Sequence, residues 1–226
     1  MAKSQSRFYG VLAVILIVGG GLIGYVVINN RDSGAVPADY EAPGLAEGEM
    51  VSADVGVSIG AEDAPVVLEE YADYQCPACG MVGTLTLPQI IDEYVETGKV
   101  RFVFYDFPLH PGASELGAMA ARCAGDQDAY WAMQKVLMGR MREWGSARNP
   151  ERLIRDYAEG LGLDGDALID CVESDKYRRV VLASRERARQ LGLGQTPTFF
   201  INGRVFTGAV GYDQMAQMIE AELAKQ

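Results

Sequence analysis

The residues best suited to chemistry are two cysteines separated by two residues, in the segment Cys76-Pro77-Ala78-Cys79. The apolar, β-branched run before them, residues 65–71, predicts a buried strand, and the pattern after them predicts a helix. Cys76 would then lie at a helix N-terminus, where free N–H groups and the helix dipole stabilise a thiolate. Cys79, one turn later, is placed to attack a mixed disulfide at Cys76. The spacing and placement predict thiol–disulfide exchange, with no cofactor beyond the Cys76–Cys79 disulfide itself.

The two remaining cysteines, Cys123 and Cys171, each stand alone in a helical pattern. Neither has the paired spacing of a zinc ligand set, so a four-cysteine zinc site with the first pair is disfavoured. In an oxidising compartment, two cysteines of one small subdomain are usually joined. We therefore expect a structural disulfide between them. Two buried free thiols and a second redox pair remain as alternatives.

The elements that position the first pair form an α/β pattern with helices in its middle. A second strand is expected at residues 99–105, and Pro88 should kink the helix that follows the cysteines and ends near residue 97. A helical block follows over about residues 112–192. Its helices are predicted from the Asn149-Pro150 start, over 164–174, and over 176–191 before Gly192. The run 198–207, with Asn202-Gly203 at its centre, predicts a hairpin, and a last helix covers about 212–224.

The N-terminal part of the chain has a different composition. Residues 8–28 contain no charge and are long enough to cross a bilayer, and Lys3 and Arg7 precede them. We expect a cytoplasmic tail at 1–7, a single transmembrane signal anchor at 8–28 and an extracytoplasmic domain beyond. A cleaved signal peptide is the alternative. Residues 29–58 read as a linker, and 59–226 as one domain.

Charge and residue counts exclude several functions. The 226 residues carry 20 Lys and Arg against 31 Asp and Glu, a formal charge of −11. Nucleic-acid backbones require clustered basic residues, so nucleic acid is not expected as the main partner. A single histidine, His110, excludes a multi-histidine metal site within this sequence. His110 lies outside the cysteine motif and is interpreted as a structural or loop-capping residue rather than a base.

Three segments together resemble the DsbA-like thiol–disulfide oxidoreductases. The segment 70–79 (EYADYQCPAC) resembles their active-site motif, and Thr196-Pro197-Thr-Phe-Phe-Ile-Asn-Gly203 resembles their cis-proline loop. Phe107-Pro-Leu-His110 resembles a segment that they carry after the second core strand. The resemblance covers about residues 59–226. It implies a thioredoxin fold with an inserted helical domain.

The resemblance also implies roles for individual residues. Cys76 would be the exposed nucleophile and Cys79 the buried resolving cysteine. Pro197 would be a cis-proline that faces them, with the backbone of Thr196 presented to an extended substrate. Glu70 would match a buried acid that exchanges a proton with Cys79 through water, and a solvent-facing position is the alternative. Some relatives carry a disulfide comparable to Cys123–Cys171.

The implied function is a membrane-anchored oxidase that forms disulfides in secreted proteins and is reoxidised by a membrane protein of DsbB or VKOR type. Ala78 departs from the best-known oxidases, which carry His between the cysteines, so the strength of the oxidant is open. A reductase or isomerase is the first alternative, and a non-enzymatic metal-binding module the second. Trp131, Trp144, Met133, Met138 and Met141 suggest core packing, with a Met-lined substrate surface as the alternative.

Overall fold

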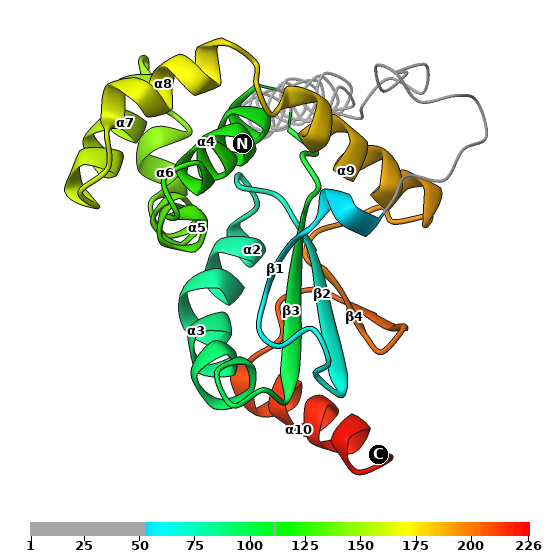
Figure 1. Cartoon of the computed structure of the whole chain (residues 1–226). Coiled ribbons are helices and arrows are strands. Elements are labelled where there is room, and N and C mark those ends of the chain that lie inside the picture. Colours follow the sequence, from blue (N-terminus) through cyan, green and yellow to red (C-terminus); the bar gives the residue numbers. More distant parts are fainter. Residues whose placement is uncertain (1–52, 111) are drawn as a thin grey trace, which may run out of the picture. The chain divides into compact units, whose positions relative to one another are not determined.

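A five-stranded mixed sheet forms the centre of the domain (Figure 1). The structure is a computed structural model that describes residues 53–110 and 112–226. The strands lie in the order β1-β3-β2-β4-β5. Strand β2 (Val66–Ala72) is parallel to β3 (Val100–Asp106) and antiparallel to β4 (Thr198–Ile201). At the edges, β1 (Val57–Ile59) pairs with β3 and β5 (Arg204–Thr207) with β4, both antiparallel.

The two faces of the sheet bury different side chains. Leu68 pairs in register with Phe102, and both lie in the larger core, which also contains Cys79. Tyr71 and Tyr105 point to the other face, where their rings stack with centroids 4.5 Å apart. Because side chains alternate along a strand, Glu70 shares the face of Leu68, which packs in the same core as Cys79.

The helical segment after β2 combines α-helical and π-helical turns. Its parts are α2 (Pro77–Met81), the π-helical η2 (Val82–Thr86), α3 (Leu87–Ile90) and the π-helical η3 (Ile91–Val95). Pro88 lies in the first turn of α3, where its missing N–H breaks no helical hydrogen bond. The interruption predicted at Pro88 is thus accommodated by the wider turn before it.

Six helices fill the connection between β3 and β4, within the predicted block. They are α4 (Ala113–Gly125), α5 (Tyr130–Gly139), α6 (Met141–Trp144), α7 (Pro150–Gly160), α8 (Gly165–Glu173) and α9 (Arg178–Gln190). The side chain of Asn149 caps α7 by accepting the Arg152 N–H at 2.9 Å, as the sequence predicts. In Figure 1, α4–α8 gather to one side of the sheet and α9 returns across it, where Ala188 packs with Tyr71 and Tyr105. The final helix, α10 (Tyr212–Leu223), packs near α3, β2 and β4.

The β4–β5 turn follows the sequence prediction. Asn202 and Gly203 have φ angles of 44° and 83°, as a type I′ turn requires. The Asn202 side chain also accepts the Val67 N–H at 2.8 Å, which ties the turn to β2. This hairpin fixes the position of the residues before it, Thr196 and Pro197.

The structure differs from the prediction where the domain begins. The sequence predicts a linker through residue 58, but η1 (Ala53–Val55) and β1 belong to the folded domain. β1 has three residues, too few to show a period, and it forms because β3 offers an unpaired edge. Within the described part of the chain, no helix is both long and apolar enough to cross a membrane. The predicted tail, anchor and linker through residue 52 lie outside it.

Candidate active site

Cys76 is the N-cap residue of α2. Its backbone is extended (φ −85°, ψ 117°), Pro77 occupies the first helical turn, and the Gly80 N–H donates to the Cys76 carbonyl at 3.0 Å. Both Cys76 and Cys79 are free thiols; Cys76 is half-buried and Cys79 fully buried. The strand–turn–helix arrangement therefore leaves one sulfur accessible and hides the other beneath it.

The two thiols of the pair have opposite acidities. A hydrogen bond from the Cys79 thiol is the main cause that lowers the pKa of Cys76 to about 5, with help from the backbone N–H groups of Cys79 and Ala78 and against partial burial. Burial is the main cause that raises the pKa of Cys79 far above the usual thiol range. At neutral pH, these shifts favour a thiolate at Cys76 and a thiol at Cys79.

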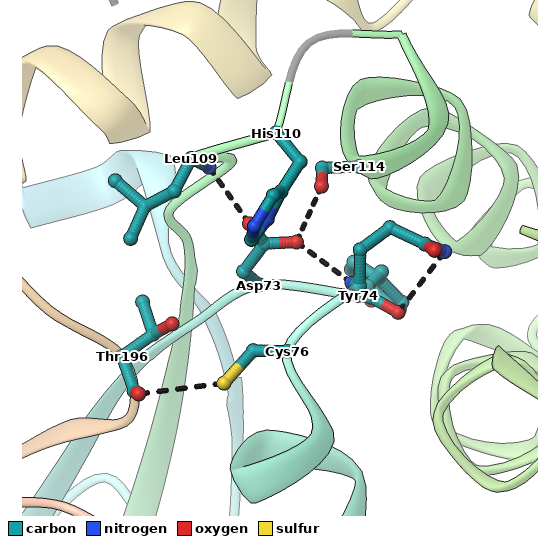
Figure 2. Close-up of polar contacts among 8 residues, drawn as sticks. Asp73, Tyr74, Cys76, Leu109, His110, Ser114 and Thr196 are labelled. Atoms are coloured by element: carbon teal, nitrogen blue, oxygen red, sulfur yellow. Dashed lines mark hydrogen bonds and ion pairs between the residues drawn. The ribbon is translucent and has the colours of Figure 1, made fainter. Parts of the chain in front are cut away.

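The loop before β4 faces the accessible sulfur. The Thr196–Pro197 peptide bond is cis. The Cys76 thiol, when protonated, donates to the Thr196 carbonyl at 3.4 Å (Figure 2). The Gly208 N–H donates to the Pro197 carbonyl at 2.8 Å, which anchors the loop to the chain after β5. Two segments 120 residues apart thus meet at the reactive sulfur.

Glu70 lies buried under the cysteine pair. It is 1% exposed and pairs in register with Phe104 on β3 and Phe199 on β4. Its Oε2 has no hydrogen-bond partner. Burial is the main cause that raises the pKa of Glu70 to about 8, and the Cys76 charge adds to it. Its carboxyl therefore holds a proton at neutral pH. The alternative from the sequence, in which Glu70 faces solvent, is wrong. Glu69, which is half-buried, is the more exposed of the two residues.

A family model described as "Thioredoxin" matches residues 52–221. The chain belongs to the thioredoxin family. It is 27% identical over 219 residues to "Probable disulfide bond formation protein D" of Bacillus anthracis, covering 95% of this chain and 93% of that one. It is 25% identical over 168 residues to "Disulfide bond formation protein D" of Bacillus subtilis strain 168, covering 73% and 76%.

Solved structures agree with this thioredoxin-family assignment at the level of the fold. The crystal structure of oxidised BdbD from Bacillus subtilis matches with a TM-score of 0.69 and 24% identity, covering 77% of this chain and 96% of that one. That of α-DsbA1 from Wolbachia pipientis matches with a TM-score of 0.68 and 23% identity, covering 75% and 92%. The DsbA-like thiol–disulfide oxidoreductase recognised from the motifs is confirmed, and so is its α/β thioredoxin fold.

One residue of this thioredoxin-family site was not singled out from the sequence. Asp73 is fully buried between β2 and the cysteine pair, and its carboxylate accepts four hydrogen bonds (Figure 2). Oδ1 accepts the Gln75 N–H at 2.7 Å and the Ser114 hydroxyl, and Oδ2 accepts the Leu109 N–H at 2.8 Å. Nδ1 of His110 lies 2.8 Å from the same Oδ2. Asp73 thus joins the cysteine loop to the loop after β3 and to the start of α4.

A sequence signal for Asp73 did exist. An Asp that accepts the N–H of the residue two positions later forms an Asx turn, and such a turn is expected where a strand ends.

His110 contacts the same carboxylate. The His110 ring is 60% exposed. Among residues 53–110 and 112–226, its only polar partner is Asp73, which is not one of the two cysteines. This contact fits the structural interpretation of His110.

The second cysteine pair is joined. Cys123 on α4 and Cys171 on α8 form a disulfide with a Cα–Cα distance of 5.9 Å. Both sulfurs are therefore unavailable for a zinc site with Cys76 and Cys79. In the described part of the chain, no cluster of three or more His, Cys, Asp or Glu residues has the arrangement of a metal site.

Proposed function

We propose that this oxidoreductase acts as an oxidase that forms disulfides in secreted proteins through Cys76 and Cys79. The observation that favours oxidation of substrates over their reduction is the lowered pKa of Cys76, to about 5. A thiolate stabilised in the reduced form makes that form favourable, so the Cys76–Cys79 disulfide tends to pass oxidising equivalents to a substrate. The names of the relatives from Bacillus, which refer to disulfide bond formation, support the same direction.

The reaction consumes one disulfide and forms another. A substrate thiolate attacks the Cys76 sulfur, a mixed disulfide forms, and Cys79 leaves as a thiolate. Glu70, with a pKa of about 8, supplies the proton that Cys79 takes up. A second substrate thiolate then attacks the substrate sulfur of the mixed disulfide, and Cys76 leaves as a stabilised thiolate. The substrate gains a disulfide, and the enzyme is left as a dithiol.

The proposed setting follows from the N-terminal composition. Residues 8–28 would hold the chain in the cell membrane as a single-pass anchor, with the catalytic domain outside the cytoplasm. A membrane oxidase of DsbB or VKOR type would reoxidise the dithiol. In the substrate complex, the Thr196 backbone beside Pro197 would pair with the substrate chain as an added strand does. The disulfide is the only redox group that this scheme requires.

The reduction potential of the Cys76–Cys79 pair tests the direction. Equilibration of the full chain with glutathione buffers should give a value well above the roughly −270 mV of thioredoxin. A value at or below that figure would overturn the oxidase proposal and favour a reductase. Ala78 is the specific reason to measure it, because a histidine at this position would add positive charge beside the thiolate.

Trapping tests the exchange mechanism separately. In Cys79→Ser, the Cys76 thiolate can attack a substrate disulfide, and one substrate sulfur leaves as a thiolate. The buried sulfur that would release the resulting mixed disulfide is missing, so substrates should accumulate as adducts that a reductant cleaves. The variant Cys76→Ser is the matched control and should trap none. Failure of Cys79→Ser to trap any cysteine-containing protein would contradict the mechanism.

A further inference from the structure

A groove opens beside the catalytic helix on the side of the helical insertion. Its volume is about 410 Å³. One wall is the first part of the helix after β2, from Pro77 through Thr84, and the other is residues 138–143, at the end of α5 and the start of α6. Pro77 directly follows Cys76 in the chain. Any substrate bonded to the Cys76 sulfur therefore has its neighbouring residues within reach of this groove.

The helix wall carries an exposed apolar stripe. Four large apolar side chains are exposed among the described residues, and two of them are Met81 (50%) and Leu85 (64%). With exposed Pro77 they are spaced four residues apart and follow one side of the helix. Pro77 and Met81 line the groove, and Leu85 continues the stripe one residue beyond Thr84, the last helix residue that lines it. Exposed apolar side chains grouped in this way mark an interaction surface rather than core packing.

The opposite wall adds adaptable and positively charged groups. Met138 is buried in the core, whereas Met141 is half-buried and lines the groove. The thioether of such a residue adjusts to side chains of different shape. Arg140 lies 3.6 Å from Glu143, but exposed Arg142 has no ion pair within the part of the chain that the structure describes. The rim is thus locally positive on a chain whose formal charge is −11. A carboxylate is the complementary ligand group.

We propose that this groove binds the residues flanking the substrate cysteine and selects unfolded segments with a large apolar side chain and an acidic side chain within three or four residues of that cysteine. The proposal rests on the proposed function. It divides recognition between two surfaces. The Thr196 backbone contacts the substrate main chain, which is the same in every sequence, whereas the groove contacts side chains and supplies the preference.

The test compares two dithiol peptides that differ only beside the reactive cysteine. One carries Leu and Glu on both sides of it, and the other carries Gly and Gln. With the oxidised full chain, the second-order rate constant should be about tenfold larger for the Leu–Glu peptide, a modest discrimination for one apolar pocket. Met81→Ser, which changes a residue of the groove wall, should reduce this ratio toward one. Val205→Ser removes a similarly exposed apolar side chain (58%) on β5 and should keep the ratio.

A charge reversal tests the acidic preference. Arg142→Glu should lower the rate ratio between the Leu–Glu peptide and a Leu–Gln peptide several-fold, and the loss should shrink at high salt. Arg152→Glu, an exposed site on α7, makes the same change in net charge and should leave this ratio as in the wild type.

The outcomes separate this proposal from the proposed function. Equal wild-type rates with the Leu–Glu and Gly–Gln peptides would overturn the groove proposal and leave the oxidase intact. Oxidation of neither peptide would overturn the oxidase. If Met81→Ser slows reoxidation by isolated membranes but leaves the peptide ratio unchanged, the groove serves the membrane partner, and the substrate proposal is wrong.

Discussion

Glu70 is a buried acid whose protonation state affects the stability of the fold. In the unfolded chain its carboxyl has the ordinary pKa of 4.5, whereas in the fold burial raises the pKa to about 8. Between these values the folded state holds a proton that the unfolded state releases, so the free energy of unfolding falls as pH rises. Glu70→Gln removes this loss. We expect its melting temperature, relative to the wild type, to increase from pH 5 to pH 8.

A neighbouring residue controls for Glu70→Gln. Glu69 lies on the other face of β2 and is half-buried, so Glu69→Gln removes the same charge without the buried acid. Its melting temperature relative to the wild type should change little over this range. Peptide oxidation by Glu70→Gln should slow by about 10²-fold, because the leaving Cys79 thiolate loses its nearby proton donor. Parallel pH profiles for the two glutamine variants would refute the role of Glu70.

Asp73 is expected to position the cysteine loop rather than react. In Asp73→Asn the amide nitrogen must replace one carboxylate oxygen, and it would face two of the four donors. We expect a loss of about 1–3 kcal/mol in the free energy of unfolding, since buried donors are left without an acceptor. Ser114→Ala removes only one of those donors and should cost less. Chemical denaturation of both variants measures this difference. If Asp73→Asn loses no more free energy of unfolding than Ser114→Ala, Asp73 does not hold the three segments together.

At the scale of elements, the sequence predicts the central fold well because its signals are local. The apolar runs of β2 and β3, the Asn202-Gly203 turn and the Asn149 cap each depend on residues that are adjacent in the chain. β1 is not predicted from the sequence, because its three residues form a strand only through their pairing with β3. The site follows the same division. The spacing of Cys76 and Cys79 is visible in the sequence. The position of Asp73 as a shared hydrogen-bond acceptor is not, because it depends on partners 36 to 41 residues away.

The Cys123–Cys171 disulfide joins α4 to α8 across 48 residues of chain. In the chain-entropy model a loop of this length stabilises by about 4 kcal/mol. The double variant Cys123→Ser/Cys171→Ser should therefore melt about 10 °C lower than the wild type, measured without reductant. The matched control, Cys76→Ser/Cys79→Ser, removes the redox disulfide and should not show this loss. Similar losses in both double variants would contradict a purely structural role for the α4–α8 bond.

For the whole molecule, the low pKa of Cys76 predicts which redox form is more stable. The fold lowers the pKa of the Cys76 thiol from its ordinary 9.0 to about 5, chiefly through the hydrogen bond from the Cys79 thiol. A lowered pKa stabilises the folded, reduced form fully above pH 9, and this gain is lost as pH falls through 5. The oxidised form has no such thiol. The burial that raises the pKa of Glu70 is common to both forms and largely cancels in their difference.

We therefore expect the reduced full chain to melt above the oxidised one at pH 8, with the difference shrinking toward pH 5. The reduction must spare Cys123–Cys171, so a mild glutathione buffer is used, and mass spectrometry after alkylation verifies that only Cys76 and Cys79 are modified. Repeating the pH series with Glu70→Gln removes any part of the pH dependence that comes from the Glu70 carboxyl. A difference that stays constant with pH would mean that the Cys76 thiolate is not stabilised by the fold. The thermodynamic basis for an oxidase would then be lost, because the redox potential and this stability difference are two sides of one cycle.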